Sequence, residues 1–452
     1  MTTTPEPQAR PQGPPGTYGV RNTLRFASNP LSWLRATADE YGDLVSMRVL
    51  GRPWVLVSHP DDIERVLVKD ARIMKRDDGM EIVRRVLGQG LLTSEGDLWK
   101  RQRKLMSQAF SPKRIQEYGA AMARVADTSL GDWRSGDVAN LHQEMARTTM
   151  KVVADVLFGA SMKARDVEAA GGALEVVNEF FSGSAEALLR VPKWIPTPRN
   201  IRVNRAVAAL DRVVYDILAR RRAEEPRDDL LGTLLAAQDD DGAGMSDVQL
   251  RDEVMTLFLA GHETTSLALS HTLYLLRKHP AIERQLHEEI ASVLRGRLPT
   301  AEDVRALPFT ECVLKETMRL YPPAWATGRE TTEPFELRGI KIPVGAQLVA
   351  SQWVVHRDAR WFPNPEGFDP SRWSPERAKD VPRYAYFPFG GGPRVCIGNH
   401  FAMMEATVLL AVIVQRFRLE LLPGERLDLR PAVTLRQQGP GLRVRIVARG
   451  VG

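Results

Sequence analysis

Apolar and polar residues are arranged in two ways along this chain, and each predicts a different kind of element. Residues 30–41 form an amphipathic stretch, and two β-rich runs, 44–49 and 54–57, lie on either side of Gly51 and predict a hairpin. From residue 59 to about 277 the pattern is mainly helical. Four turn-rich stretches interrupt it: 88–96, 131–136, 191–199 and 239–244.

The last third of the chain is more irregular. A hairpin-like segment over 335–351 precedes a proline-rich irregular stretch over 360–393. An apolar helix is predicted over 401–417, and strand candidates follow at 427–435 and 442–447.

These elements predict a mainly α protein with small peripheral β-sheets (α+β). A chain of 452 residues without a Ser/Gly linker in its middle favours one large domain, which we place over residues 21–452. Residues 1–20 are polar and proline-rich, and we expect them to form a disordered arm.

Composition narrows the possible functions. The net charge is +6, but acidic and basic residues are mixed along the chain, which argues against a nucleic-acid binder. The two cysteines, Cys312 and Cys396, indicate a reducing compartment rather than a disulfide framework, and Cys312 is expected to be a small buried residue. No apolar run approaches the roughly 18 residues that span a bilayer. We therefore expect a soluble, cytoplasmic protein, and a monomer.

Cys396 has the clearest chemical role. It lies in the loop Phe389-Gly-Gly-Gly-Pro-Arg-Val-Cys-Ile-Gly398, where three glycines permit backbone conformations closed to other residues and Pro393 stiffens the turn. The loop ends just before the predicted helix over 401–417, whose N-terminus favours negative charge, so we expect the sulfur to be ionised. Without a second cysteine or histidine at a zinc-like spacing, a single thiolate suits the axial ligand of a haem iron.

Five positions of this loop form a more specific pattern: Phe389, Gly392, Arg394, Cys396 and Gly398. They match Phe-x-x-Gly-x-(Arg or His)-x-Cys-x-Gly, and the chain resembles the cytochrome P450 family from about residue 30 to its end. The resemblance implies the cytochrome P450 fold, haem b (iron protoporphyrin IX) held by Cys396, and O₂ as co-substrate. Electrons are expected from NAD(P)H through separate proteins, a ferredoxin or flavodoxin with its reductase.

A second match lies in a long predicted helix, which Ser246 would cap and Pro280 would end. Its segment Ala-Gly-His-Glu-Thr-Thr, residues 260–265, resembles the family's oxygen-binding motif, Ala/Gly-Gly-x-Asp/Glu-Thr.

The side chains of this motif suggest a proton-delivery unit. Gly261 offers no Cβ to crowd a ligand, and the Thr264 hydroxyl can bond the Ala260 carbonyl and locally open the helix. The resemblance implies that Glu263 and Thr264 are the catalytic pair that delivers protons during dioxygen activation. Singly, each would also fit an ordinary helix residue.

Other positions extend the resemblance. Glu316, Arg319 and Arg372 match the family's Glu-Arg-Arg triad, whose expected role is to hold the irregular stretch behind the cysteine loop. The residues expected to contact haem are Trp99, Arg103, Ala260, Gly261, Arg329, Phe389, Gly392, Arg394 and Gly398. Those expected around the substrate are Phe180, Phe181, Leu257, Ala260 and Ala324.

The resemblance predicts a haem-dependent monooxygenase, a hydroxylase or epoxidase that inserts one oxygen atom of O₂ into a hydrophobic small molecule of the fatty acid, terpenoid, steroid or polyketide class. One alternative is a peroxide-using or rearranging haem-thiolate enzyme, which usually lacks the acid–alcohol pair. Another is a non-catalytic haem-based binding or sensor protein.

A basic cluster marks one possible partner surface. In the family its helix borders the face where electron donors dock, although a solvated helix face explains it equally well. The cluster consists of Lys100, Arg101, Arg103, Lys104, Lys113 and Arg114.

Overall fold

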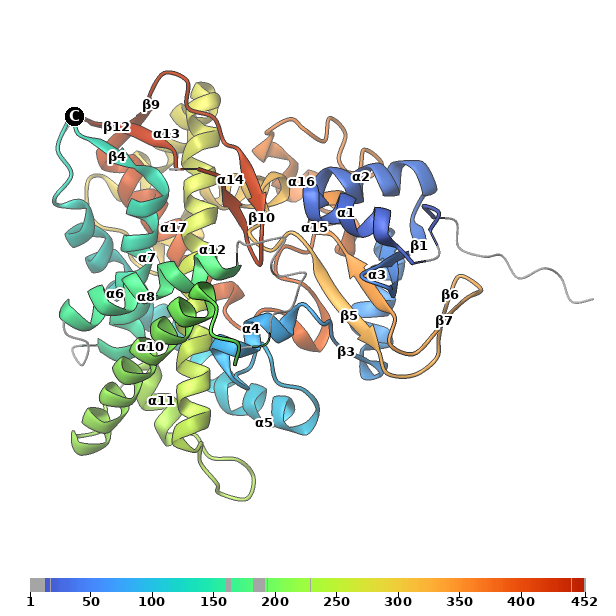
Figure 1. The fold of residues 1–452 in the computed structure, drawn as a ribbon. Helices are drawn as coiled ribbons and strands as arrows, with labels where there is room; N and C mark the ends of the chain where they lie inside the picture. Colours follow the sequence, from blue (N-terminus) through green and yellow to red (C-terminus); the bar gives the residue numbers. More distant parts are fainter. Residues whose placement is uncertain are drawn as a thin grey trace, which may run out of the picture.

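A 32-residue helix, α12 (Asp247–Lys278), runs through the middle of the structure (Figure 1). As predicted, Ser246 caps it, because its hydroxyl accepts a hydrogen bond from the Gln249 N–H at 3.2 Å. The side chain of Gln249 accepts from Arg101 at 3.0 Å. The next helix begins at Pro280, which cannot supply the N–H that would continue α12.

The structure is a computed structural model that describes residues 13–16, 18–159, 164–181, 192, 194–227, 229–439 and 441–450. The other helices are α1 (Val20–Ser28), α2 (Pro30–Tyr41), α3 (Pro60–Glu64), α4 (Met80–Leu87), α5 (Gly96–Ser107), α6 (Pro112–Leu130), α7 (Leu141–Phe158), α8 (Ala164–Phe181), α10 (Pro198–Ala223), α11 (Leu230–Ala236), α13 (Pro280–Leu294), α14 (Pro308–Leu320), α15 (Gln352–Val355), α16 (Pro375–Ala378) and α17 (Asn399–Arg416). Shorter helical turns are the π-helical η1 (Arg65–Lys69) and the 3₁₀ turns η2 (Ala71–Ile73), η3 (Gln108–Phe110), η5 (Asp303–Ala306), η6 (Pro370–Trp373), η7 (Arg383–Ala385) and η8 (Gly392–Arg394).

The strands form small sheets beside the helices. The largest has the order β1-β2-β8-β5-β3, in which β2 and β8 are parallel and the other pairs are antiparallel. A three-stranded sheet has the order β4-β12-β9, and two hairpins, β6-β7 and β10-β11, complete the set. The strands are β1 (Leu44–Val49), β2 (Arg52–Val57), β3 (Met74–Arg76), β4 (Val138–Asn140), β5 (Thr327–Thr331), β6 (Phe335–Leu337), β7 (Ile340–Ile342), β8 (Gln347–Ala350), β9 (Phe417–Leu421), β10 (Leu429–Pro431), β11 (Leu435–Gln437) and β12 (Arg443–Ala448).

The predicted fold class is confirmed: the protein is mainly helical with small sheets, in one domain. The predicted strand over 427–435 is wrong in detail, because the chain turns after β10 and the segment forms the hairpin β10-β11. Strands β3 and β4 lie inside the region predicted as helical and have three residues each, too short for a readable alternation. The turn-rich stretch over 191–199 lies partly outside the described residues.

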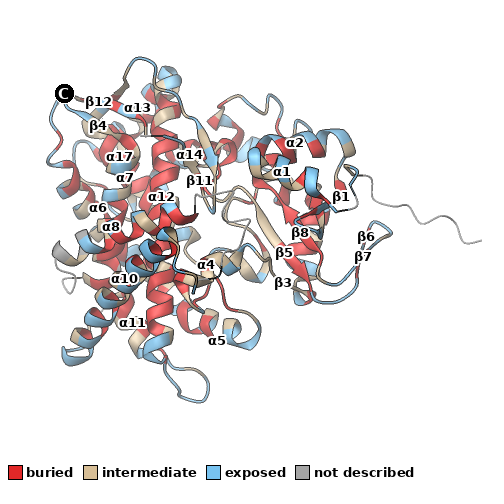
Figure 2. Ribbon diagram, in the orientation of Figure 1, coloured by how far each residue is buried: buried red, intermediate tan, exposed pale blue. Residues whose placement is uncertain are grey.

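The main hydrophobic core surrounds α12. Buried residues of α6, α7, α10, α14 and α17 pack with it, whereas a second cluster lies under the larger sheet. Figure 2 shows the contrast between the buried length of α12 and the exposed outer faces of α10 and α2. Of the helices in the described part of the chain, none has both the length and the apolar character required to cross a bilayer.

The predicted triad is a buried hydrogen-bonded network. Arg319 donates to both carboxylate oxygens of Glu316, at 2.9 and 2.8 Å, and Arg372 donates to the same carboxylate at 3.3 Å. Trp373 adds a bond from its indole N–H at 3.0 Å. Neither Glu316 nor Arg319 is exposed to solvent. Arg319 also donates to three backbone carbonyls, those of His356, Pro365 and Gly367. The network therefore fixes the irregular chain that leads to the cysteine loop (residues 389–398).

Replacing Arg319 with Met should destabilise the fold by about 3–5 kcal/mol, since it leaves the Glu316 charge buried without its main partner. Arg377→Met is the matched control. Arg377 pairs with Asp369 at 3.0 Å in the same region, but both side chains are exposed, and such pairs contribute about 0–1 kcal/mol. Urea denaturation followed by tryptophan fluorescence measures both variants. Equal losses of stability would contradict a structural role specific to the buried network.

Candidate active site

The cysteine loop is held in a shape that requires glycine. Gly390 and Gly392 both have positive φ, 72° and 66°. A Cβ on Gly392 would lie 1.8 Å from the carbonyl oxygen of Leu67 in η1, whereas one on Gly390 would meet nothing within 4 Å. The loop is closed by a hydrogen bond from the Cys396 N–H to the Phe389 carbonyl at 3.0 Å. The glycine run thus serves close packing against η1 as well as backbone freedom.

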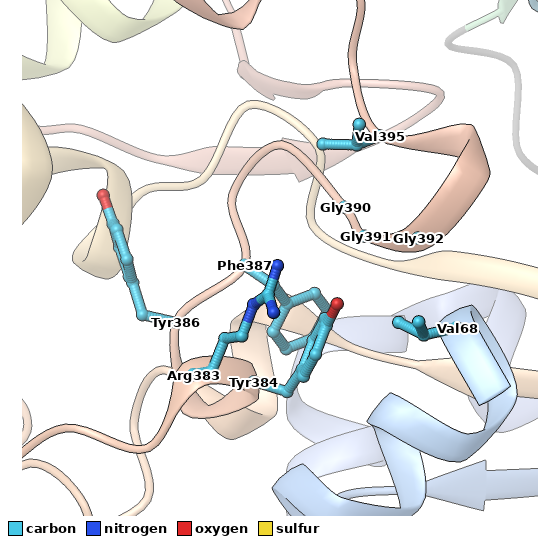
Figure 3. A pocket seen from close by; sticks show the side chains of 9 residues that line it. All are labelled: Val68, Arg383, Tyr384, Tyr386, Phe387, Gly390, Gly391, Gly392 and Val395. Atoms are coloured by element: carbon cyan, nitrogen blue, oxygen red, sulfur yellow. The ribbon is translucent and has the colours of Figure 1, made fainter.

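A pocket of about 390 Å³ lies on the outer side of this loop. Figure 3 shows Arg383, Tyr384 and Phe387 on one wall, Val68 on another and the three glycines between them and Val395, while Tyr386 points away. Cys396 and the α12 motif are not among its lining residues. None of the reactive residues therefore contributes to this pocket.

The thiol of Cys396 is exposed, yet the surrounding protein raises its pKa by burial. Both observations hold if the sulfur faces a space inside the protein rather than bulk solvent. The N–H of Gly398 and the charges of Arg103 and Arg76 act in the opposite direction but do not outweigh burial. The direction of this shift is opposite to the expectation that the loop and the helix terminus ionise the sulfur.

Three arginines gather near the cysteine loop with few anions to balance them. Arg329 is buried, and burial together with the charges of Arg76 and Arg394 lowers its pKa to about 9. Burial and Arg76 also lower the pKa of Arg394, to about 10. Arg394 pairs with Glu95, while the Nε of Arg76 has no hydrogen-bond partner among the described residues. Such an excess of buried positive charge fits a ligand with two carboxylates, as the propionates of haem supply.

Trp99 and Arg103 lie one turn apart on α5, and both contact residues of the cysteine loop. The guanidinium of Arg394 lies over the Trp99 ring, 4.1 Å from its centroid. Arg103 donates to the carbonyl of Val395 at 2.9 Å, directly before Cys396. Both residues therefore support the cysteine loop from the side of α5.

The α12 motif is continuous α-helix. The Thr264 hydroxyl donates to the Ala260 carbonyl at 2.7 Å, as predicted, but the helix does not open there. Ala260 is exposed and Thr264 is half-buried, although most of the neighbouring residues are buried, so this face of the helix is less covered than the rest. A Cβ on Gly261 would meet Val153 of α7 at 3.1 Å, so the missing side chain also permits close packing of the two helices.

Glu263 is buried, and its carboxylate accepts hydrogen bonds from three side chains elsewhere in the chain. Arg436 of β11 donates to one carboxylate oxygen at 2.6 Å, Thr434 donates to the same oxygen at 3.3 Å, and Asn178 of α8 donates to the other at 3.1 Å. Although burial would raise the pKa of Glu263, Arg436 and two nearby histidines lower it below its usual value. The carboxylate is thus charged and turned toward β11, which excludes a solvated helix charge.

The residues expected around the substrate are not all together. Leu257 is half-buried on the same face of α12 as Ala260, and Ala324 is half-buried in the segment before β5. Phe180 is buried beneath two guanidinium groups, those of Arg199 at 4.5 Å and Arg85 at 5.1 Å from the ring centroid. Phe181 is buried beside it, with ring centroids 5.8 Å apart. The phenylalanines are therefore core residues between α4, α8 and α10.

Sequence reasoning missed Arg436 as a site residue, and it expected residues 76–92 only around the substrate, so it missed Arg76 as a residue near Cys396. Arg76 ends the three-residue strand β3, and Arg436 lies in a hairpin that was predicted as one strand. Neither belongs to a local motif, so only the tertiary structure reveals that each faces a reactive group.

The match to a known family is close to complete. The profile of the Cytochrome P450 family matches residues 11–441. The chain belongs to the cytochrome P450 family. It is therefore a haem monooxygenase that uses O₂ and acts on hydrophobic small molecules, with reducing equivalents supplied by partner proteins.

Several curated cytochrome P450 enzymes are similar over nearly their whole length. Cyclooctatin synthase of Streptomyces melanosporofaciens is 39% identical, with 92% of this chain and 91% of that protein covered. Cyclooctat-9-en-7-ol 5-monooxygenase of the same organism is 34% identical, with 94% of each covered. Pentalenene oxygenase of Streptomyces avermitilis is 33% identical, with 96% of each covered.

Solved structures agree with the fold. A cyanobacterial cytochrome P450 with retinoic acid bound has a TM-score of 0.87 and 28% sequence identity, covering 98% of this chain and all of that one. The haem domain of another cytochrome P450 has a TM-score of 0.86 and 25% identity, covering 98% of each chain.

Gly392→Ala should abolish thiolate-ligated haem binding, because the new Cβ collides with the Leu67 carbonyl in addition to the positive φ. Gly390→Ala is the control: it meets open space, so it should cost only about 1–2 kcal/mol of backbone strain and retain haem. Haem content and the Soret band of the reduced carbonyl complex distinguish them. Normal haem binding by Gly392→Ala would contradict the packing role.

Arg76→Gln should speed haem loss roughly tenfold or more, since charge-assisted hydrogen bonds contribute about 1.5–3 kcal/mol each. Arg72→Gln, an exposed arginine on the preceding turn, should leave haem retention unchanged. The measurement is the rate of haem transfer to apomyoglobin at neutral pH. Equal rates for the two variants would remove Arg76 from the haem site.

Proposed function

We propose that this cytochrome P450 oxygenates a cyclic terpenoid. The observation that carries the proposal is the set of curated relatives: two are named for cyclooctatin chemistry and one for pentalenene, and the alignments cover 91–96% of those proteins. The half-buried Leu257 and Ala324 and the exposed Ala260 offer small or apolar surface, which suits a hydrophobic guest held by burial.

Haem b is the cofactor we assign to the space in front of Cys396. Cys396 would supply the axial thiolate, and Arg76, Arg329 and Arg394 would bind the propionates. When bound, the haem supplies a redox-active iron that activates O₂ for the insertion of one oxygen atom. The chain itself excludes water, orients the substrate and moves protons.

Glu263 and Thr264 are the residues to which we assign proton delivery. Thr264 is half-buried on the face of α12 that also exposes Ala260, and its hydroxyl, which donates to the Ala260 carbonyl at 2.7 Å, would turn to donate at the reaction site. Glu263, the preceding residue along the chain, is charged, so it would first take up a proton and then pass it toward Thr264. The presence of this acid–alcohol pair favours O₂-dependent oxygenation over peroxide use or rearrangement.

Electrons would come from NAD(P)H through a reductase and a ferredoxin or flavodoxin. On α5, Lys100 and Lys104 are exposed and pair with Asp97 at 2.8 Å and Asp240 at 2.5 Å, which are exposed as well. Exposed pairs of this kind are weak, so an acidic partner can replace the carboxylates. Arg101 is less available, because Asp239, Gln249 and two backbone carbonyls already hold it.

Cyclic terpene hydrocarbons and alcohols should shift the spin state of the ferric haem and yield products one oxygen atom heavier. Fatty acids and macrolides of similar size should do neither. Difference spectroscopy measures the first response, and mass spectrometry after turnover with NAD(P)H and a surrogate ferredoxin and reductase measures the second. A response to fatty acids alone would contradict the terpenoid assignment, and product formation only with peroxide would contradict the monooxygenase mechanism.

A further inference from the structure

The α4–α5 segment (residues 88–95) connects α4 to α5 beside α12 (Figure 1). Two adjacent carboxylates of α12 hold it. The Gln89 N–H donates to Asp252 Oδ2 at 2.7 Å, and the Leu91 N–H donates to Glu253 Oε2 at 2.8 Å. Both carboxylates are buried. Side chains of the helix therefore supply the partners that the backbone of an irregular segment needs.

Two glycines allow the α4–α5 segment to lie this close to the helix. Gly88 has a positive φ of 59°, and a Cβ there would lie 2.3 Å from Asp252 Oδ1. A Cβ on Gly90 would lie 2.1 Å from the hydroxyl oxygen of Thr256, which itself donates to the Asp252 carbonyl at 2.7 Å. The contact with α12 is thus fixed by shape as well as by hydrogen bonds.

The other end of the α4–α5 segment binds two of the arginines near the cysteine loop. Arg394 donates to the Ser94 carbonyl at 2.8 Å and pairs with the Glu95 carboxylate. The other oxygen of Glu95 accepts from the backbone N–H of Arg76 at 2.8 Å. Between the two ends, the Ser94 N–H donates to the Gly90 carbonyl at 2.9 Å. A connected series of contacts therefore leads from the carboxylates of α12 to both arginines.

We propose that Asp252 and Glu253 position the haem-binding arginines, Arg76 and Arg394, by fixing the α4–α5 segment on α12. The two arginines repel each other in a buried region, and Glu95 supplies a negative charge that contacts both. The place of Glu95 depends on the α4–α5 segment. Because the two carboxylates of α12 act through that segment, they are positioning residues. The inference rests on the proposed haem site, but it concerns haem binding rather than turnover.

Replacing Glu253 with Met tests this role, because Met removes the acceptor for the Leu91 N–H and has a side chain of similar length. Transfer of haem from the ferric holoprotein to apomyoglobin should become roughly fivefold faster or more, since a buried N–H loses its partner and the α4–α5 segment loses an attachment.

Glu253→Gln is the conservative variant. Burial raises the pKa of Glu253 to about 8, so its carboxyl is mainly neutral at neutral pH. Gln keeps this neutrality and an oxygen that can accept from the Leu91 N–H, so haem transfer should stay at about the wild-type rate. Acceleration by Glu253→Gln as large as that by Glu253→Met would overturn the proposal.

Glu289→Met is the matched control. Glu289 of α13 accepts from the N–H groups of Phe309 and Thr310 at 2.7 and 2.8 Å, so the same kind of bond holds the start of α14. Its replacement should lower the urea midpoint of unfolding without changing the rate of haem transfer. Equal acceleration by Glu289→Met, or a wild-type rate in Glu253→Met, would overturn the proposal.

The dimethyl ester of haem separates the positioning of arginines from a general loosening of the fold. Its esterified propionates carry no charge, so the arginines contribute little to its binding. The wild type and Glu253→Met should therefore lose the ester at equal rates, although they lose haem at different rates. An undiminished difference with the ester would overturn the proposal. Absence of oxygenated product from every terpenoid would defeat the proposed function and leave these transfer rates unaffected.

Gly90→Ala replaces Glu253→Met if the latter yields no holoprotein. The new methyl group would meet the Thr256 hydroxyl oxygen and push the α4–α5 segment away from α12 without changing any charge, whereas Gly172→Ala in α8 meets nothing within 4 Å. Haem transfer should be faster from Gly90→Ala than from Gly172→Ala, and equal rates would overturn the proposal.

Discussion

The contact between Gly392 and the Leu67 carbonyl is the constraint on which the cysteine loop depends. A Cβ on residue 392 would lie only 1.8 Å from that oxygen, so no side chain fits, and the loop lies directly on η1. The chain before the loop is fixed as tightly. The Phe387 N–H donates to His356 Nε2 at 3.0 Å, and the His356 carbonyl accepts from Arg319 at 2.9 Å. The position of Cys396 is therefore set by a continuous series of contacts that begins at α14.

The buried positive charges near the cysteine loop are not balanced by an equal number of negative charges. Arg76, Arg329 and Arg394 repel one another in a buried region, and each has a lowered pKa for that reason or because of burial. The thiol of Cys396 likewise has a raised pKa. Without a ligand, the buried arginines lack enough negative partners and the thiol is poorly ionised. The two carboxylates of haem would balance the arginines, and its metal ion would favour the thiolate. Haem binding should thus stabilise this part of the fold, in the way that any ligand specific to the native state does.

Local motifs predicted the parts of the site that lie within one loop or one helix. The cap at Ser246, the Thr264–Ala260 bond and the Glu316–Arg319 pair all depend on fixed sequence spacings, and they were foreseen for that reason. Burial was not foreseen. Phe180 was expected at the pocket because it is aromatic and in the right segment, but two arginines cover its ring.

Tertiary contacts also act on residues that the motifs did identify. The Gly261 prediction considered only the ligand, and the structure adds a packing constraint from Val153 of another helix. The state of Cys396 was judged from its helix terminus alone, but the surrounding protein determines it. Such effects depend on what packs against a residue, and no local spacing encodes them.

Two carboxylates on α12 show how strongly that environment acts. Glu253 and Glu263 are both buried, yet burial raises the pKa of Glu253 to about 8, whereas the pKa of Glu263 is lowered. Arg436, which comes from the hairpin β10-β11, makes the largest contribution to this difference, and two nearby histidines add to it. This hairpin is itself joined to the chain around Ala324, because the Leu435 N–H donates to the Pro323 carbonyl at 2.8 Å and Trp325 donates to the Ala432 carbonyl at 2.9 Å.

The charge on Glu263 is therefore held in place by the same hairpin that supports the segment expected beside the substrate. A displacement of that segment would move Arg436 relative to Glu263, and the pKa of Glu263 would rise toward the value that burial alone imposes, as it does for Glu253. The proton affinity of Glu263 thus depends on the position of the chain around Ala324. The coupling passes through the hairpin that carries Arg436 and through its two hydrogen bonds to that chain, without direct contact between Glu263 and Ala324.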